Sequence, residues 1–592
     1  MNRKQRRATH KHGRSAGSLP ADFAGVQIQQ LLVDAAECER LRKFDDAVRT
    51  YKRALQLKPD HAEVFNNLGR VLLAQGKPMD ASAYFARSLV LMPQLLKQYA
   101  GICATLVALL PPFGEALRKQ AEAWPKQLPE SELFGSGGLT TIADNPLLLQ
   151  VMQSIPVQDI AFERLLTALR RWLLSAAHTR EVTSEIVTGF ACALAQQCFI
   201  NEYVFATTPE EDTWINDLRR TLGDALASDG AVDAMQIAVL AMYEPLHAQA
   251  FTPALLARKW SPTLDNVLTQ QVRAPTREIE LRNSIPRLTT IEDDVSKQVR
   301  QQYEENPYPR WVRAAGQVTP VSIDQYVREQ CPAGAHTPLG KTDALDILVA
   351  GCGTGQIAIA SAQKYLGARV LAVDLSLSSL CYAKRNTPQS LAAQIEYAQA
   401  DILKLATIGR SFDAIDCSGV LHHMADPLEG WRILLTLLRP GGLLHLGFYS
   451  GAGRKDVAAA RSFIAERGFG STPPEIRHCR QELLKTPLSS VTRFTDFFST
   501  SECRDLLFHV HEAHMTIPAI NTFIGEHRLK FLGFEFDAPA MRHYRNHFAA
   551  SGWSLIDLDR WHEFEMKSPD TFAGMYQFWV QKPQASPSVV PA

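Results

Sequence analysis

Apolar and polar positions follow two different patterns along the chain. In the first half, apolar residues recur every three or four positions, for instance from Asp159 to Ala176 and from Ser184 to Phe205, which is the period of an amphipathic helix. From Ala344 onward, short apolar runs alternate with helical stretches, which is the pattern of a parallel sheet with crossover helices. The sequence therefore predicts a helical half followed by an α/β half.

A repeat with a spacing of 34 residues opens the helical half. The two copies share small, aromatic, small and proline positions, which are Ala47, Tyr51, Ala54 and Pro59 in the first copy and Ala81, Phe85, Ser88 and Pro93 in the second. Small residues let two antiparallel helices pack closely, the aromatic ring fills the groove, and proline ends the second helix. Over residues 28–95 this pattern resembles the tetratricopeptide repeat, although Asp34-Ala35 stands where Leu-Gly is usual.

The role of the repeats is open between two readings. Because two copies are fewer than a stable solenoid needs, we expect the segment from Leu95 to Leu110 to cap them. The resemblance implies a groove that binds a protein partner or a second copy of the chain. A helix pair with a purely structural role is the alternative.

Candidate chemistry begins after the first predicted strand, Asp346 to Ala350. The strand leads into Gly351-Cys352-Gly353-Thr354-Gly355-Gln356, where glycines let the backbone turn tightly and helix N-terminal amides face a ligand. The second strand ends in Asp374, 19 residues after Gly355, where a carboxylate can accept both hydroxyls of a ribose. This spacing predicts a cofactor that contains a nucleoside.

The remaining strands narrow the choice of cofactor. Three further apolar runs lead to Ala400-Asp401-Ile402, to Ser418-Gly419 and, after Arg439-Pro-Gly-Gly442, to Tyr449. This ordered set resembles the class I S-adenosylmethionine-dependent methyltransferases. An NAD-binding turn is disfavoured because Ala358 occupies the position of its third glycine.

The resemblance implies an enzyme with a Rossmann-like, seven-stranded sheet that binds S-adenosylmethionine. Asp401 is then expected to hold the adenine amino group, Asp374 the ribose, and the glycine turn the methionine portion. The implied cofactor contacts are Gly351, Cys352, Gly353, Thr354, Gly355, Gln356, Asp374, Leu375, Asp401, Ile402, Ser418 and Gly419. Ala350 departs from the acidic residue that many members carry, which predicts weakened rather than abolished cofactor binding.

These patterns divide the chain into predicted domains. The methyltransferase resemblance covers residues 343–585, with an antiparallel hairpin from 529–536 and 575–582 and a helical insert at 451–527 that caps the substrate. The other predicted parts are a basic disordered tail at 1–26, repeats at 27–115, a helical domain at 116–300, a lid or linker at 301–342 and a disordered tail at 586–592.

An aromatic and proline-rich segment precedes the first strand. Tyr303-Glu-Glu-Asn-Pro-Tyr308-Pro-Arg-Trp311 resembles a motif found before the catalytic domain of bacterial tetratricopeptide-repeat methyltransferases. The resemblance implies a lid in which Tyr303, Tyr308 and Trp311 close over cofactor and substrate. A packed interdomain linker is the alternative.

Methyl transfer depends on alignment and desolvation rather than on a dedicated nucleophile. A hydroxyl or acidic carbon acceptor does need a general base, and His422 or His423, just after the fourth strand, is best placed for this role. The alternative is that one of them only caps the following turn. Ser418-Gly-Val-Leu lacks the N-P-P-aromatic pattern of nitrogen methylases, which disfavours nucleobases as acceptors for this chain.

Two functions follow from these observations. The first is a methyltransferase acting on an unidentified small molecule, or on a protein presented by the helical half. The second is an interaction scaffold whose methyltransferase fold is catalytically degenerate, which the intact glycines and aspartates disfavour.

Charge and cysteine content exclude several further classes. The chain has 62 basic and 62 acidic residues, so no overall field attracts nucleic acid. The ten cysteines form no C-x-x-C pair, which is typical of a cytoplasmic protein and offers no metal site. The spacing of His509, His511 and His514 points their side chains in different directions if they share a helix, so no metal is predicted there either. No apolar run reaches the roughly 20 residues that cross a bilayer.

Overall fold

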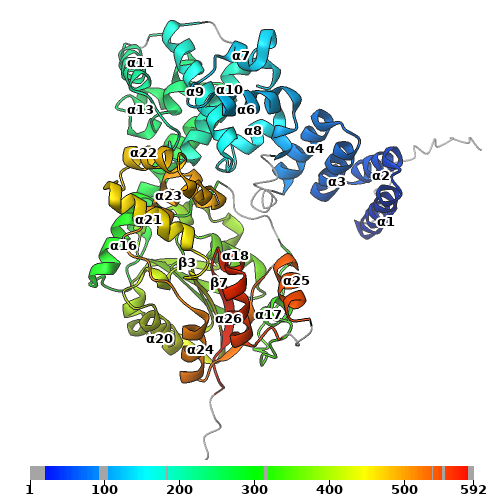
Figure 1. Cartoon of the computed structure of the whole chain (residues 1–592), viewed down its shortest axis with the longest axis vertical. Helices are drawn as coiled ribbons and strands as arrows, with labels where there is room; N and C mark the ends of the chain where they lie inside the picture. The colour runs from blue at the N-terminus through cyan, green and yellow to red at the C-terminus, as the bar shows by residue number, and fades with distance from the viewer. Residues whose placement is uncertain are drawn as a thin grey trace, which may run out of the picture. The chain divides into compact units, whose positions relative to one another are not determined.

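The computed structural model describes residues 21–92, 105–181, 184–228, 230–312, 318–536, 538–549 and 554–584 (Figure 1). The chain divides into two compact units, residues 1–92 and 93–592. Most of the predicted basic tail, residues 95–104 of the predicted capping segment and the predicted tail at 586–592 lie outside the described residues.

The described part of the first unit, residues 21–92, consists of four helices, α1 (Ala21–Arg40), α2 (Phe44–Leu57), α3 (Ala62–Ala74) and α4 (Pro78–Leu91). The repeated small and aromatic positions are buried between them. A Cβ atom on Gly69 would lie 2.8 Å from the Phe85 ring, so α3 and α4 approach this closely only with glycine there. Ser88 Oγ donates a hydrogen bond to the carbonyl of Ala62 at 2.9 Å. The small residues thus set the helix spacing, as the repeat pattern predicts.

The second unit begins with a helical region. Its helices are α6 (Pro111–Ala123), α7 (Glu130–Phe134), α8 (Pro146–Met152), α9 (Ile160–Thr179), α10 (Glu185–Ile200), α11 (Pro209–Ala227), α12 (Ala234–Ala241), α13 (Thr252–Ala257), α14 (Pro262–Leu268), α15 (Ala274–Leu281), α16 (Asp294–Glu305) and α17 (Ile323–Gln330). Asp159 and Ser184 cap α9 and α10 by accepting backbone N–H groups. The helix predicted to reach Phe205 ends at Ile200, because Glu202 and Tyr203 adopt left-handed backbone angles.

A seven-stranded sheet follows, in the order β3-β2-β1-β4-β5-β7-β6. The strands are β1 (Leu345–Ala350), β2 (Ala368–Asp374), β3 (Ile395–Gln399), β4 (Phe412–Ser418), β5 (Leu438–Phe448), β6 (Lys530–Phe534) and β7 (Tyr576–Gln581). β7 runs antiparallel to both of its neighbours, and the other pairs are parallel. This is the sheet that the methyltransferase resemblance implies.

Apolar side chains cover both faces of the sheet, which explains why its strands read as continuous apolar runs. The flanking helices include α18 (Gln356–Lys364), α19 (Leu377–Asn386), α20 (Pro427–Leu437), α24 (Ile517–Glu526), α25 (Ala538–His547) and α26 (Leu558–Lys567). Because α25 and α26 lie between β6 and β7 in sequence, these strands form an antiparallel pair without a tight hairpin turn.

The insert after β5 forms a small helical cap with a core of its own. Its helices are α21 (Lys455–Arg467), α22 (Pro473–Leu483) and α23 (Thr500–Phe508), and Figure 1 shows them between the helical region and the sheet. Arg480 of α22 and Glu163 of α9 form a buried ion pair at 2.7 Å, which fixes the cap to the helical region. The next helix, α24, instead packs in the core beside the sheet, so the cap ends near residue 508.

Among the described residues, no helix combines the length and apolar character needed to cross a membrane.

Candidate active site

The glycine turn after β1 lines a cavity of about 370 Å³ at the carboxyl ends of the strands. Gly351 and Gly353 have φ angles of 74° and 50°, which disfavour residues with a side chain. A Cβ atom on Gly351 would lie 2.4 Å from Val420, and one on Gly353 would lie 2.7 Å from the carbonyl of Tyr308. The turn therefore closes against its neighbours only because these positions are glycine.

Asp374, at the end of β2, faces the same cavity. Its two carboxylate oxygens accept the backbone N–H groups of Gly353 and Ser376, each at 2.8 Å. Burial raises the pKa of Asp374 to about 6, and the two N–H bonds oppose that rise only in part. Each oxygen keeps a lone pair, so the carboxylate can still accept ligand hydroxyls.

Asp401, after β3, supplies a second carboxylate. Its Oδ1 accepts the N–H of Leu403 at 3.0 Å, whereas Oδ2 is buried without an aligned hydrogen bond from the described residues. Burial raises the pKa of Asp401 as well. The Ser296 side chain opposes part of that rise, and an oxygen without an aligned hydrogen bond in a cavity wall can accept from a ligand or water donor. The glycine cradle, the Asp374 carboxylate and this oxygen together fit a nucleoside with an amino group on its base.

The other predicted cofactor contacts divide into two groups. Cys352, Gln356, Leu375, Ile402, Ser418 and Gly419 line the cavity with the residues above. Thr354 and Gly355 do not, because Thr354 Oγ1 donates to the carbonyl of Pro309 and Gly355 packs against Ala383.

The segment from Tyr303 to Trp311 passes over the glycine turn. Tyr303, Tyr308 and Pro309 line the cofactor cavity. Trp311 does not: it is buried behind the turn, where its Nε1 donates to Thr354 Oγ1 at 3.0 Å. Two of the three predicted lid aromatics thus face the cavity, and the third anchors the segment.

The two histidines after β4 have different surroundings. His423 lines the cavity, whereas His422 is fully buried, stacks on Tyr449 and has no hydrogen-bond partner among the described residues. Burial lowers the pKa of both rings, so both are neutral near pH 7. Of the two predicted bases, only His423 lines the cavity.

The structure corrects the expectation that His509, His511 and His514 share a helix. Helix α23 ends at Phe508, and these residues follow it in a non-helical segment. His509 stacks on His423 with ring centroids 3.8 Å apart. In the described part of the chain, His423, His509 and Asp505 bring potential metal-ligand atoms within 4.8 Å of one another.

Backbone groups of His511 determine which nitrogen carries the proton in both stacked rings. A carbonyl only accepts, so His423 Nδ1, 3.1 Å from the His511 carbonyl, carries a proton and Nε2 keeps its lone pair. A backbone N–H only donates, so His509 Nδ1, 3.0 Å from His511 N, is unprotonated and Nε2 carries the proton.

A hydrogen-bond chain continues from His509. Its Nε2–H faces the Tyr303 hydroxyl at 3.2 Å, and that hydroxyl donates to Asp505 Oδ1 at 2.6 Å. Because His509 Nε2 carries a proton, it has no lone pair to offer a metal ion. This arrangement therefore favours a hydrogen-bond network over a metal site. The only basic imidazole nitrogen left in the cluster is His423 Nε2.

Several residues of this site have no local signal in the sequence. Tyr449, Met575 and Gln577 complete the cavity from strands β5 and β7 and their ends, far along the chain from the glycine turn. Asp505 lies in the last turn of α23 and His509 directly follows the helix, and an aspartate and a histidine four residues apart could have indicated a pair.

Comparison with known proteins agrees with this geometry. A methyltransferase-domain family model matches residues 348–446, and a TPR-repeat model matches residues 42–76. An uncharacterized protein of Synechococcus sp. is 30% identical over 220 residues, which cover 34% of this chain and 50% of that protein. The chain thus spans half the length of that relative.

A ubiquinone biosynthesis O-methyltransferase of Xanthomonas campestris pv. campestris is 32% identical over 177 residues, covering 30% of this chain and 70% of the relative. Among solved structures, PKMT2 from Rickettsia typhi matches with a TM-score of 0.34 and 16% identity, over 45% of this chain and 55% of that chain. Magnesium protoporphyrin IX methyltransferase from Synechocystis PCC 6803 with bound SAH matches with a TM-score of 0.25 and 13% identity, over 50% and 90% of the two chains. Because the Xanthomonas relative is 32% identical and is covered over 70% of its length, the chain belongs to the class I S-adenosylmethionine-dependent methyltransferases, and it carries a tetratricopeptide repeat in its N-terminal part.

Proposed function

We propose that this enzyme methylates an acidic hydroxyl group, such as a phenol or enol, and that His423 is its general base. The observation that supports this is the 3.1 Å distance between His423 Nδ1 and the His511 carbonyl. Because a carbonyl only accepts, Nδ1 carries the proton, and the Nε2 lone pair is left available on a ring that lines the cavity. S-adenosylmethionine supplies a methyl group activated by a sulfonium. The protein must then hold the acceptor oxygen in line and remove its proton.

The pKa of His423 limits the acceptor. Burial lowers this pKa, and the nearby Asp505 carboxylate opposes the decrease only in part. A neutral, weakened base is ready at pH 7 but removes protons best from acidic hydroxyls. The O-methyltransferase name of the Xanthomonas relative is consistent with an oxygen acceptor.

The neighbours of His423 position it rather than react. His509 stacks on its ring, and the Tyr303 hydroxyl connects His509 to Asp505. Asp505 is buried within the coulombic reach of His423, so a negative charge there stabilises the imidazolium that forms after proton transfer. Tyr303 and Tyr308, held over the glycine turn, exclude water from the reacting groups.

In this proposal Asp374 binds the ribose, Asp401 the adenine amino group, and the glycine turn the methionine portion of the cofactor. The repeat unit is proposed to bind a protein partner, because paired helices with a small-residue interface match the TPR-repeat model. A protein acceptor brought by that partner remains the second form of the substrate.

The test incubates purified full-length enzyme with methyl-labelled S-adenosylmethionine and a trial acceptor. The first acceptor is 3,4-dihydroxybenzoic acid, and the next are the small-molecule and protein fractions of a cell extract. We expect the label in a methyl ether, which survives mild alkali. Label released as methanol by mild alkali, or found on nitrogen, would contradict a hydroxyl acceptor. Loss of transfer in His423→Gln with intact cofactor binding would identify the base.

A further inference from the structure

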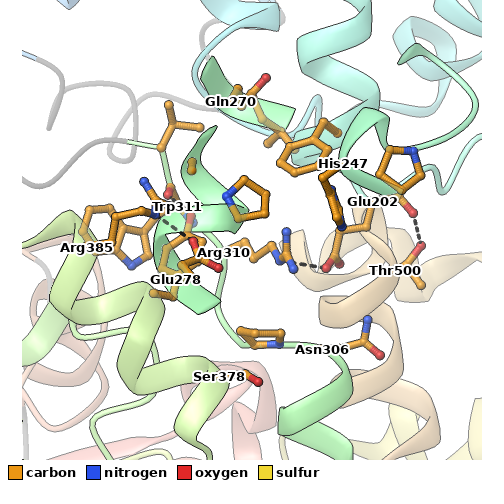
Figure 2. Close-up of a pocket in the computed structure, with 18 of the residues that line it drawn as sticks. Glu202, His247, Gln270, Glu278, Asn306, Arg310, Trp311, Ser378, Arg385 and Thr500 are labelled. Carbon is orange, nitrogen blue, oxygen red and sulfur yellow. Dashed lines mark hydrogen bonds and ion pairs between the residues drawn. The ribbon is translucent and has the colours of Figure 1, made fainter. Parts of the chain in front are cut away.

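A second cavity, shown in Figure 2, is lined by other residues of the 303–312 segment than those that line the first cavity. It has a volume of about 780 Å³, within the roughly 300–1,000 Å³ of small-molecule sites. Its walls come from α10, α15, α19 and the cap helices α22 and α23. Residues of one segment thus line two cavities, with Tyr303, Tyr308 and Pro309 lining the first and Arg310 and Trp311 the second.

Arg310 is the central charged group of this cavity. Figure 2 shows its guanidinium directed toward Glu202, and Nε lies 3.0 Å from Glu202 Oε1 without an aligned hydrogen bond. Arg310 donates no hydrogen bond to any residue in the described ranges, and its side chain is 26% exposed. Its guanidinium also lies 6.0 Å from the ring centre of Phe199. The four terminal N–H donors are therefore available to a ligand.

Tyr203 adds a second unpaired donor. Its hydroxyl is buried and lacks a hydrogen-bond partner within the described part of the chain. The phenol is close enough to Arg310 for the two groups to interact electrostatically. Tyr203 and Arg310 thus line one cavity and lack hydrogen bonds from the hydroxyl and the guanidinium to the described residues. This indicates that a ligand or water supplies the missing hydrogen-bond acceptors.

The backbone that carries Glu202 and Tyr203 is held in an unfavourable conformation. Their φ angles are 54° and 59°, although helix ends that need this conformation usually have glycine. The cap stabilises the turn: Thr500 Oγ1 donates to the Glu202 carbonyl at 2.8 Å, and Ser501 N donates to Glu202 Oε2 at 2.6 Å. Strained backbone of this kind clusters at ligand sites.

The charges around the cavity favour an anion. Arg385 is paired with Glu278 at 2.7 Å, and Arg282 with Glu304 at 3.1 Å. Arg477 also lines the cavity, but it bonds only the Tyr203 carbonyl and has no carboxylate within ion-pair distance among the described residues. The third glutamate of the wall, Glu305, is paired with Arg504 at 2.7 Å. Arg310 and Arg477 are therefore the lining arginines that these three glutamates do not pair, and Glu202 is the one further carboxylate of the wall.

We propose that this cavity binds a small molecule with a carboxylate or phosphate group, which docks on the Arg310 guanidinium and the Tyr203 hydroxyl. A guanidinium edge matches both oxyanions through paired N–H donors. Apolar lining from Phe199, Pro275 and Ile279 accommodates the rest of the molecule.

Such a ligand would be linked to cofactor binding through the shared segment. Pro309 and Trp311 flank Arg310, and both bond Thr354 in the glycine turn. An anion bound to Arg310 therefore also restrains the glycine turn that is proposed to bind the cofactor. We expect the anion to increase the affinity for S-adenosylhomocysteine and, by reciprocity, the cofactor product to increase the affinity for the anion by the same factor.

The test is calorimetric titration of the full chain with inorganic phosphate and with citrate at constant ionic strength, with and without S-adenosylhomocysteine. We expect saturable binding of at least one probe, and the probe that binds identifies the oxyanion. Arg310→Lys, which keeps the charge but loses the paired donors, and the isosteric Tyr203→Phe should each weaken binding at least tenfold. Arg385→Lys, in the same cavity but paired with Glu278, is the matched control and should stay within twofold.

Two results would overturn the proposal. The first is the absence of saturable binding of both probes. The second is binding that Arg310→Lys and Tyr203→Phe leave unchanged while circular dichroism shows both variants folded. An affinity for S-adenosylhomocysteine that saturating anion does not alter would refute the linkage.

Discussion

The raised pKa of Asp374 makes cofactor affinity depend on pH in a specific way. Burial raises this pKa from 3.8 to about 6, because two backbone N–H bonds only partly offset the desolvation of the charge. The ribose hydroxyls need the ionised carboxylate as acceptor. Above about pH 6 the site is therefore ready, and below it binding must first release a proton.

The magnitude follows from one titrating group. The dissociation constant of S-adenosylhomocysteine should be constant between pH 7 and 8 and should increase by at most about tenfold per pH unit below pH 6. Asp374→Asn keeps the shape but removes the charge, which we expect to weaken binding by about 1.5–3 kcal/mol, or about 10- to 150-fold, at pH 7.5. It should also remove most of the pH dependence.

Isothermal titration calorimetry at pH 5, 6, 7 and 8 measures both effects, and buffers of different ionisation enthalpy report the released proton. Asp346→Asn is the matched control, because Asp346 pairs with Arg369 and Arg439 near the other end of β1. A constant affinity from pH 5 to 8, or an Asp374→Asn variant with the same pH dependence as the natural chain, would refute the assignment.

Three further predictions concern catalysis, folding and modularity. His423→Gln should lower kcat by about 10²–10⁴, while the affinity for S-adenosylhomocysteine changes little. The control is His422→Phe, a substitution of the buried neighbour, which should reduce kcat far less. An equal loss of kcat in both variants would argue against a base role for His423. Glu163→Gln leaves Arg480 buried without its partner and should destabilise the cap by about 3–5 kcal/mol in urea unfolding. The Glu163→Gln/Arg480→Met double variant should recover this stability. Full stability of the single variant would contradict the buried pair. Deletion of residues 1–92 should leave the affinity for S-adenosylhomocysteine intact, since these residues form a separate compact unit. A folded truncation that no longer binds S-adenosylhomocysteine would show instead that the repeats support the site.

Local sequence patterns were sufficient for the strands, the glycine turn and the aspartates that follow β2 and β3. These features depend on neighbouring residues: an apolar run, a turn that needs positive φ, and a polar residue where the strand ends. The start of β5 was predicted too late, at Leu443 instead of Leu438, because Pro440, Gly441 and Gly442 suggest a turn while the chain already pairs with β4.

The cluster of Tyr303, His423, Asp505 and His509 depends on contacts that no local pattern contains. His423 and His511 are 88 residues apart, and Tyr303 and Asp505 are 202 residues apart. The proton positions depend further on the backbone N–H and carbonyl of His511, which any residue except proline would supply. For the same reason the sequence could not distinguish His422 from His423, or place Trp311 behind the glycine turn instead of over the cofactor.

A crystal structure of the full-length enzyme with S-adenosylhomocysteine tests the account most directly. We expect Asp374 on the ribose hydroxyls, Asp401 Oδ2 on the adenine amino group, and the thioether sulfur facing the space beside His423 Nε2, with Tyr303 and Tyr308 over it. A ligand in this cavity whose sulfur points away from His423, or whose nucleoside contacts neither aspartate, would contradict the proposed site.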